Sequence, residues 1–269
     1  MKIISPGFLP NENGTNLDNP HSRKVESHTV SGPIIKDCSE CPEMVVIPAG
    51  SFDMGSNDYA AEKPIHHVTI ASFLMGKTEV TQGQWKAVMG TASGSFACGD
   101  NCPVEGVSWN DAKAFLVRLI KVTGRKYRLP TEAEWEFAAR AGSTNKWSFG
   151  DDESQLVSYS WYYENSGRKT QAAGQTHPVS LKLPNAFGLY DMHGNVWEWT
   201  QDCWHDNYSG APIDGSAWTS GCSGDLRTLR GGSWYNFSNS LRSANRSSAA
   251  QDDRRGFIGF RLARDFSTP

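Results

Sequence analysis

The chain has no apolar run long enough to cross a bilayer, and this absence predicts no membrane-spanning segment. Residues 1–20 also lack the basic start and apolar middle of a signal peptide. Neither sign of charge is in large excess, since 26 basic and 29 acidic side chains leave a formal net charge of −3. A chain so balanced has no global attraction to nucleic acid, and we expect no nucleic-acid partner.

Arginine is nevertheless common late in the chain, where two interpretations compete: ion pairs with ring stacking, or a phosphate-binding patch. We favour the first, because guanidinium groups readily pair with carboxylates and stack on aromatic rings. The arginines concerned are Arg227, Arg230, Arg242, Arg246, Arg254, Arg255, Arg261 and Arg264.

The usual signatures of catalytic sites are missing. The chain has no glycine-rich phosphate loop of the nucleotide-binding types. His66, His67 and His193 have no Ser, Cys or second metal ligand at a diagnostic spacing. We therefore assign no catalytic residue from the sequence.

Cysteine is scarce and is absent after residue 222. The six cysteines are Cys38, Cys41, Cys98, Cys102, Cys203 and Cys222. The first four form two close pairs that fit either a four-thiolate zinc site or two disulfides. We favour three disulfides, the third joining the last two cysteines, because the count is even and the pairs lie in polar loop sequence. Disulfides predict an extracytoplasmic or cell-surface protein, and a reduced cytoplasmic protein is the alternative.

Composition divides the chain into two parts. Residues 1–36 are rich in Pro, Asn, Ser and Gly without periodicity, which predicts a flexible N-terminal arm. Residues 37–269 are long enough to bury a core and predict a single domain. Ten tryptophans and 26 glycines indicate an aromatic-filled fold with many loops.

Local patterns predict three helices and several strands. Capping boxes, which satisfy the free N–H groups at a helix start, pair Thr81 with Gln84, Ser108 with Asp111, and Thr131 with Glu134. Residues 44–54 predict two strands with a reversal at Pro48 and Gly50, and alternation over residues 68–72 predicts another strand. Residues 254–264 predict a terminal strand that closes the sheet.

Six segments carry a recognisable pattern in chain order. They are MVVIPAGSFDMG (44–55), EVT (79–81), PVEGVSW (103–109), YRLPTEAEWE (127–136), NAFGLYDMHGNVWEW (185–199) and RGGSW (230–234). Together they resemble the formylglycine-generating enzyme, or sulfatase-modifying factor, family. The resemblance implies an α+β variant of the C-type lectin fold, with a small twisted antiparallel sheet, flanking helices and much irregular structure.

The resemblance also implies what this chain has lost. Active family members convert a substrate cysteine to formylglycine with copper and oxygen, using two cysteines shortly after the Gly-Gly-Ser turn. Here Asn236 occupies the first of these positions, and the second falls within residues 238–241, where no thiol is present. Since Cu(I) prefers thiolate or thioether ligands, we expect no copper and no copper-dependent formylglycine formation.

Calcium is the cofactor that the resemblance implies. The family holds it at the segment equivalent to residues 191–198, so we expect Asp191 and Glu198 to supply carboxylate oxygens and Gly194 and Val196 to supply carbonyls. The alternative is that Asp191 caps a turn and Glu198 pairs with an arginine.

The end of the chain resembles the variable proteins of diversity-generating retroelements, whose C-type lectin folds present a mutable ligand-binding face. Aromatic anchors mixed with small polar residues suit recognition. The resemblance implies a ligand-binding set: Trp234, Tyr235, Asn236, Phe237, Ser238, Ser240, Leu241, Ser247, Ser248, Ala249, Asp253, Arg255, Gly256 and Phe257.

Two functions therefore compete on one framework. The first is a ligand-binding or receptor-binding protein that displays a variable C-terminal face to a protein or other surface ligand. The second is a non-canonical oxidoreductase of the same family that acts on a peptide, such as a siderophore precursor. We favour binding, because the chain offers no paired carboxylates, no nucleophile with its base and no cofactor motif.

Overall fold

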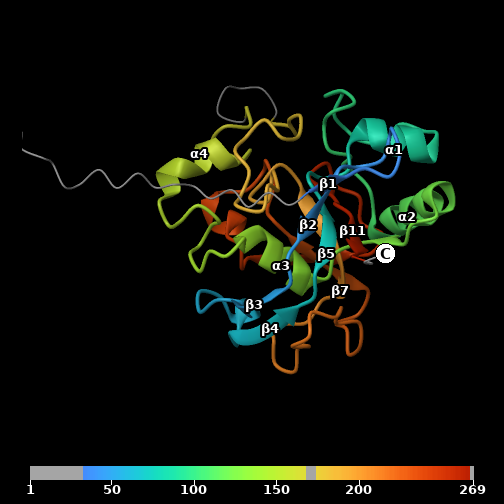
Figure 1. Ribbon diagram of the computed structural model, residues 1–269. Coiled ribbons are helices and arrows are strands. Elements are labelled where there is room, and N and C mark those ends of the chain that lie inside the picture. Colours follow the sequence, from blue (N-terminus) through green and yellow to red (C-terminus); the bar gives the residue numbers. More distant parts are fainter. Residues whose placement is uncertain (1–32, 168–173, 267–269) are drawn as a thin grey trace, which may run out of the picture.

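Three sheets frame the computed structural model, which describes residues 33–167 and 174–266 (Figure 1). The five-stranded sheet is antiparallel throughout, in the order β1 (Ile34–Ile35), β2 (Met44–Ile47), β5 (Phe73–Gly76), β11 (Ala263–Asp265) and β6 (Tyr127–Arg128). The four-stranded sheet has the order β10 (Ile258–Gly259), β7 (Trp197–Cys203), β8 (Leu226–Arg230) and β9 (Arg246–Ala250), with β10 parallel to β7. The third sheet pairs β3 (Gly50–Met54) with β4 (His66–Ile70).

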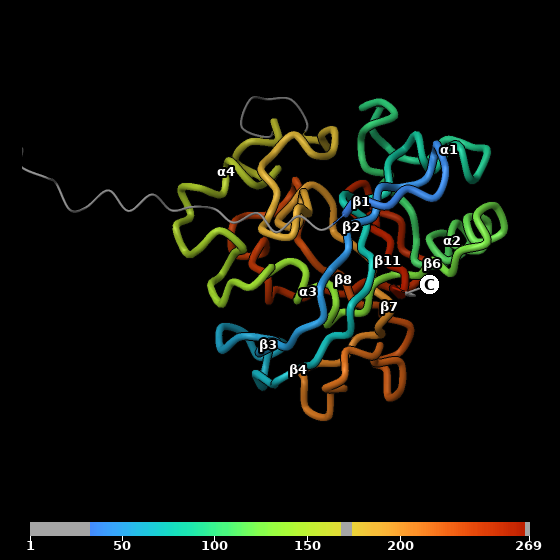
Figure 2. The backbone as a smooth tube through the Cα atoms, in the orientation of Figure 1, coloured from blue at the N-terminus to red at the C-terminus, as the bar shows by residue number. Residues whose placement is uncertain are grey.

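The helices begin where the capping boxes predict. In α1, α2 and α3 the hydroxyls of Thr81, Ser108 and Thr131 accept the expected backbone N–H bonds. The helical segments are α1 (Gln82–Met89), α2 (Trp109–Thr123), α3 (Glu132–Arg140), α4 (Leu156–Tyr159), and the 3₁₀ turns η1 (Ala60–Glu62), η2 (Glu153–Gln155) and η4 (Ser238–Leu241). Figure 2 shows α1 and α2 on one side of the five-stranded sheet and α3 on the other.

The five-stranded sheet is buried on both faces. Alternate side chains of β2 and β5 point to opposite faces, as the pleat of a strand requires. Met44 and Leu74 pack in one core with α1 and α2, whereas Val45 and Met75 pack in a second core with α3. Each such side chain contributes about 1.5–3 kcal/mol when fully buried, so both cores stabilise this sheet.

Three predicted boundaries differ in the structure. The reversal predicted at Pro48 and Gly50 is wrong, because β2 pairs with β5 while β3 pairs with β4, so the chain passes from one sheet into another. The terminal strand over residues 254–264 is split into β10 and β11, since Phe260 leaves the ladder to fill a core. Ile34 and Ile35, placed in the arm, pair with β2. Residues 1–32 lie outside the described residues.

All six cysteines form disulfides, in the pairs Cys38–Cys41, Cys98–Cys102 and Cys203–Cys222. The prediction of three disulfides is confirmed, and the zinc alternative is wrong because its thiols are oxidised. Such crosslinks are typical of proteins from oxidising compartments. In the part of the chain that the structure describes, no helix is both long and apolar enough to cross a membrane.

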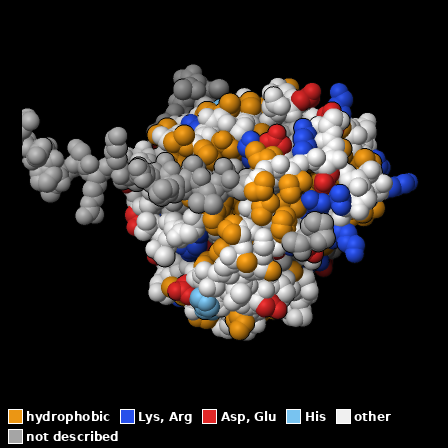
Figure 3. Space-filling model, viewed as in Figure 1, with side chains coloured by type: hydrophobic (Ala, Val, Ile, Leu, Met, Phe, Trp, Pro, Cys, Tyr) orange, Lys and Arg blue, Asp and Glu red, His pale blue; other side chains and the backbone are white. Residues whose placement is uncertain are grey.

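Most of the late arginines pair or stack, as predicted. Arg230, Arg242, Arg246 and Arg261 are buried in ion pairs with glutamates, and Arg227 stacks on the Trp109 ring at 4.2 Å. On the face drawn in Figure 3, acidic side chains lie among the basic ones. Ion pairing and stacking therefore account for the cluster of arginines in the sequence.

Candidate functional site

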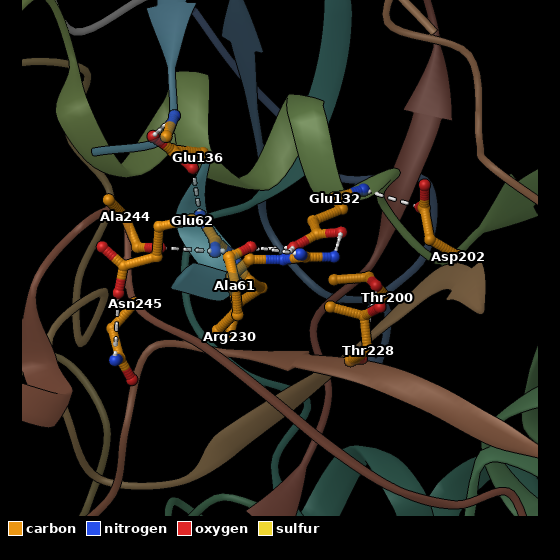
Figure 4. A network of polar contacts seen from close by, with 12 residues as sticks. Ala61, Glu62, Glu132, Glu136, Thr200, Asp202, Thr228, Arg230, Ala244 and Asn245 are labelled. Atoms are coloured by element: carbon orange, nitrogen blue, oxygen red, sulfur yellow. Dashed lines mark hydrogen bonds and ion pairs between the residues drawn. The ribbon is translucent and has the colours of Figure 1, made fainter. Parts of the chain in front are cut away.

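Two buried arginines fix the loop between β8 and β9, and Figure 4 shows the first of them, Arg230. Arg230, the last residue of β8, bonds the Glu136 carboxylate and donates to the carbonyls of Ser243 at 2.8 Å and Ala244 at 3.0 Å. Arg242 forms a two-bond pair with Glu62 of η1, at 2.9 and 2.7 Å. Because both ends of the loop are held by charge-assisted bonds, residues 231–241 rest on a rigid frame.

A glycine turn opens this loop. Gly231 and Gly232 have φ values of 98° and 75°, in the left-handed region that favours glycine. A Cβ on Gly232 would lie 2.8 Å from the Ser240 carbonyl oxygen and would clash with Leu241. The turn therefore depends on both glycines; Ser233 and Trp234 directly after it are buried, and exposure begins at Tyr235.

An aromatic face follows the turn. We define it by the rings of Phe96, Tyr163, Trp234, Tyr235, Phe237 and Phe257, which contact one another in pairs. The centroids of Tyr235 and Phe257 are 5.7 Å apart and those of Tyr163 and Phe237 are 4.3 Å apart. Tyr235 and Phe237 are 46% and 55% exposed. The sequence patterns missed Phe96 and Tyr163, since only the fold brings them here from distant segments.

Asn236 lies in the middle of this face with its orientation fixed. Its side-chain oxygen accepts hydrogen bonds from the indole N–H of Trp197 at 2.9 Å and from the Ser233 hydroxyl at 2.7 Å. The backbone carbonyl of Asn236 accepts the N–H of Tyr163 at 3.0 Å. An amide, rather than a thiol, is thus held at the position where the family resemblance places the first cysteine.

The structure brings together only part of the predicted ligand-binding set. Gly256 joins the aromatic face, because its carbonyl accepts the Trp234 indole N–H at 3.0 Å, and Asp253 and Arg255 pair beside it at 2.8 Å. Ser238 and Ser240 follow the face as half-buried residues of η4.

The other predicted residues lie elsewhere. Leu241 and Ala249 are buried, and so is Trp234, whose ring packs edge-on against Tyr235, so the assignment of these three side chains to an exposed face is corrected. Ser247 and Ser248 are half-buried on β9, at the edge of the four-stranded sheet opposite β10. The residue types of Ser247, Ser248 and Ala249 suited a variable face, but strand pairing holds these residues away from it.

A buried carboxylate lies against the aromatic face. One oxygen of Glu105 accepts the backbone N–H groups of Ser95 and Phe96, the second of these at 2.9 Å. Its other oxygen is buried without a partner, and a Cβ on Gly256 would stand 3.5 Å from it. Burial raises the pKa of Glu105 above its usual value, against the lowering effect of the two backbone hydrogen bonds.

The two predicted carboxylate ligands of calcium are both buried, but they differ in the hydrogen bonds that they already accept. Glu198 accepts two bonds from Arg261, at 2.6 and 2.7 Å, and one from the Trp135 indole at 2.8 Å. This is the arginine pairing that the alternative interpretation expected. One oxygen of Asp191 accepts the Ser180 N–H at 2.8 Å, and the other is buried without a partner. Asp191 therefore has one unpartnered oxygen that can bind a cation, whereas both carboxylate oxygens of Glu198 already accept hydrogen bonds.

A further acid, Glu79, was not among the predicted ligands. It is fully buried, and neither of its carboxylate oxygens has a hydrogen-bond partner. Burial, and then the nearby charge of Asp191, raise its pKa well above the usual value. Within the described ranges, no three His, Cys, Asp or Glu side chains are grouped so that they alone hold a metal, so any ion here needs backbone oxygens as well.

The comparisons with known proteins agree with this framework. A model of the family described as the Sulfatase-modifying factor enzyme 1-like domain matches residues 31–266. The chain belongs to this family. The formylglycine-generating enzyme of Mycobacterium tuberculosis is 30% identical, and the match covers 83% of this chain and 98% of that enzyme.

Two solved structures are similar to this family member. PvdO from Pseudomonas aeruginosa is 40% identical with a TM-score of 0.80, and the match covers 88% of this chain and 99% of PvdO. Treponema denticola variable protein 1 is 32% identical with a TM-score of 0.76, and the match covers 87% of this chain and 98% of that one. The predicted α+β fold of the formylglycine-generating enzyme type, a C-type lectin variant, is confirmed.

The ion pairs that hold the loop yield a stability prediction. Glu136→Gln should lower the free energy of unfolding by about 3–5 kcal/mol, because it leaves the charges of Arg230 and Arg140 buried beside a neutral amide. The control Glu43→Gln breaks a partly exposed pair with Lys77 and should cost less than about 1 kcal/mol. Urea unfolding followed by circular dichroism compares them, and equal losses would contradict the assigned role of Glu136.

Asp202 yields a pH prediction. It is buried and accepts the N–H groups of Glu132 and Trp218, both at 2.7 Å. Burial, aided by the charge of Glu132, raises its pKa from the ordinary 3.8 to about 7. The folded state therefore keeps a proton that the unfolded chain releases, so this contribution to stability is complete below pH 3.8 and is lost as the pH rises through about 7.

Between pH 5 and 8, the unfolding free energy of the wild type should fall by roughly 2 kcal/mol more than that of Asp202→Asn. Urea titrations at each pH measure the two slopes. The exposed control Asp100→Asn should keep the wild-type slope, and an unchanged slope in Asp202→Asn would show that another group titrates.

Proposed function

We propose that this family member is a ligand-binding or receptor-binding protein that uses its aromatic face. The observation that carries the proposal is the exposure of Tyr235 and Phe237, 46% and 55%, on a loop fixed by buried arginines. Rigid aromatic rings offer large contact areas at a low cost in conformational entropy, as they do in antibody loops. The ligand is a protein or another surface ligand.

The surroundings of the face support binding over copper chemistry. Asn236 offers an amide where the resemblance places a catalytic cysteine, and amide groups are poor ligands for Cu(I). The likeness to Treponema denticola variable protein 1 extends over 87% of this chain. The three disulfides support an extracytoplasmic or cell-surface location, where such a face would meet its ligand.

We also propose that a calcium ion stabilises the segment 191–198. The support is the unpartnered oxygen of Asp191 together with the Gly194 and Val196 carbonyls, which are hard oxygen donors of the kind that calcium prefers. Such an ion would neutralise the buried negative charge of Asp191. The role is structural, and no step of ligand binding is assigned to it.

A peptide oxidoreductase is the second candidate, and Glu105 is the observation that favours it. A carboxyl group with a raised pKa beside an aromatic face is suited to proton transfer once a ligand displaces residues 94–96. Mass spectrometry of peptides incubated in air with the protein separates the two functions. A binding protein leaves the peptide mass unchanged, whereas an oxidoreductase that transfers two hydrogens from the peptide to dioxygen lowers the peptide mass by two hydrogens and releases hydrogen peroxide.

The binding proposal predicts the effect of removing the rings. Peptides selected from a random phage-displayed library on the wild-type protein should bind the triple variant Tyr235→Ala, Phe237→Ala, Phe257→Ala at least about 30-fold more weakly, since each buried aromatic anchor contributes about 2 kcal/mol or more. Biolayer interferometry measures the affinities. The melting temperature should fall only by the contribution of Phe257, which is half-buried against a core, because Tyr235 and Phe237 are exposed.

Val117 and Val122 supply the matched control, since they are 66% and 70% exposed on α2. The double variant Val117→Ala, Val122→Ala should bind the selected peptides as the wild type does. Peptides that bind the triple aromatic variant with wild-type affinity would place the site elsewhere.

A further inference from the structure

Two unpartnered acids lie on adjacent stretches of chain. The backbone N–H of Tyr190 donates to the carbonyl of Lys77 at 2.9 Å, which sets residues 77–79 beside residues 190–191. Glu79 on the first stretch is fully buried, and Asp191 on the second is 2% exposed. Both oxygens of Glu79 and one oxygen of Asp191 have no hydrogen-bond partner.

The nearby cations are engaged elsewhere. Arg261 donates to the Gly76 carbonyl at 3.1 Å and to the Tyr190 carbonyl at 2.9 Å, but its carboxylate partner is Glu198. The ammonium of Lys182 donates to the Val157 carbonyl at 2.7 Å and lies over the Trp161 ring. Arg261 is ion-paired with Glu198, and although its charge also acts on Glu79 and Asp191, one guanidinium stands against three buried carboxyl groups.

Protonation alone does not resolve this arrangement. Protonation would remove the charge of Glu79, yet both of its oxygens would stay buried without a hydrogen bond. A buried polar group without a hydrogen bond costs about 1–3 kcal/mol. Placing a divalent cation between Glu79 and Asp191 satisfies the unpartnered oxygens and neutralises both charges. Buried charges in proteins are paired or coordinate metals for this reason.

A cleft leads toward the pair. Its volume is about 590 Å³, and its lining includes Thr78, which precedes Glu79, and Ser180, whose N–H bonds Asp191. Glu43, Asp100 and Thr81 line the same cleft, together with Lys36, Lys77 and Lys86. Neither acid lines the cleft, but an ion in it would reach Thr78, next to Glu79 in the chain, and Ser180, which is hydrogen-bonded to Asp191.

We infer that Glu79 is a ligand of the calcium ion proposed above, acting with Asp191, while Glu198 remains the partner of Arg261. The inference rests on that proposed ion. It keeps Asp191 as one anionic ligand and replaces Glu198, which the family resemblance implied, with Glu79. Two carboxylates completed by backbone carbonyls and water form an irregular oxygen shell, which calcium accepts more readily than magnesium.

Calorimetric titration of the metal-free 269-residue chain with calcium chloride tests the inference, with melting temperatures measured in parallel. Wild type should bind one calcium ion and melt several degrees higher when saturated. Glu79→Gln should bind at least ten-fold more weakly and lose most of that rise. Without calcium, Glu79→Gln should melt at or above the metal-free wild type, because it removes one of the buried like charges.

Glu43→Gln is the control, since it removes a carboxylate from the cleft lining but not from the buried pair. It should bind calcium as the wild type does. Wild-type affinity in Glu79→Gln would overturn the role of Glu79 and leave the calcium ion standing. A wild-type protein that takes up no calcium would overturn both.

Discussion

Buried carboxylate–guanidinium pairs between α3 and the strands β8 and β9 hold the molecule together. Every residue of α3 is buried, including Glu132 and Glu136, which face Arg246 and Arg230. Carboxylates in such a place are tolerated only when each has a well-aligned cation, because their desolvation is costly. The helix, the two strands and the loop that joins the strands must therefore take up their positions together.

Helix α3 also contacts residues that hold the aromatic face and residues beside the acidic pair Glu79 and Asp191. Trp135 of α3 donates its indole N–H to Glu198 at 2.8 Å, and the Arg230 guanidinium lies 5.4 Å from the centroid of its ring. Arg230 fixes the loop that bears the aromatic face, and Glu198 holds Arg261 beside the acidic pair. A cation bound at the acidic pair would thus stabilise the frame on which the aromatic face is displayed.

The frame of the β8–β9 loop and the aromatic face differ in how tightly their residues are constrained. The Gly231–Gly232 turn and the arginines around it leave little freedom, since their neighbours are in direct contact and their charges are buried. The side chains of Tyr235 and Phe237 project from that frame and take no part in the buried ion pairs. Such a division lets residue types on the face change at little cost in stability, which suits a protein that recognises ligands.

The sequence alone determined the features that depend on neighbouring residues or on order along the chain. The capping boxes placed the three long helices, the even cysteine count indicated disulfides, and six ordered segments identified the fold. Tertiary structure decided which strands pair, so β2 and β3 separate into different sheets and Ala249 is buried. It also brought Phe96 to the aromatic face and Glu79 beside Asp191. Alternation along a strand defines two faces but not a partner, and contacts between distant segments leave no local pattern.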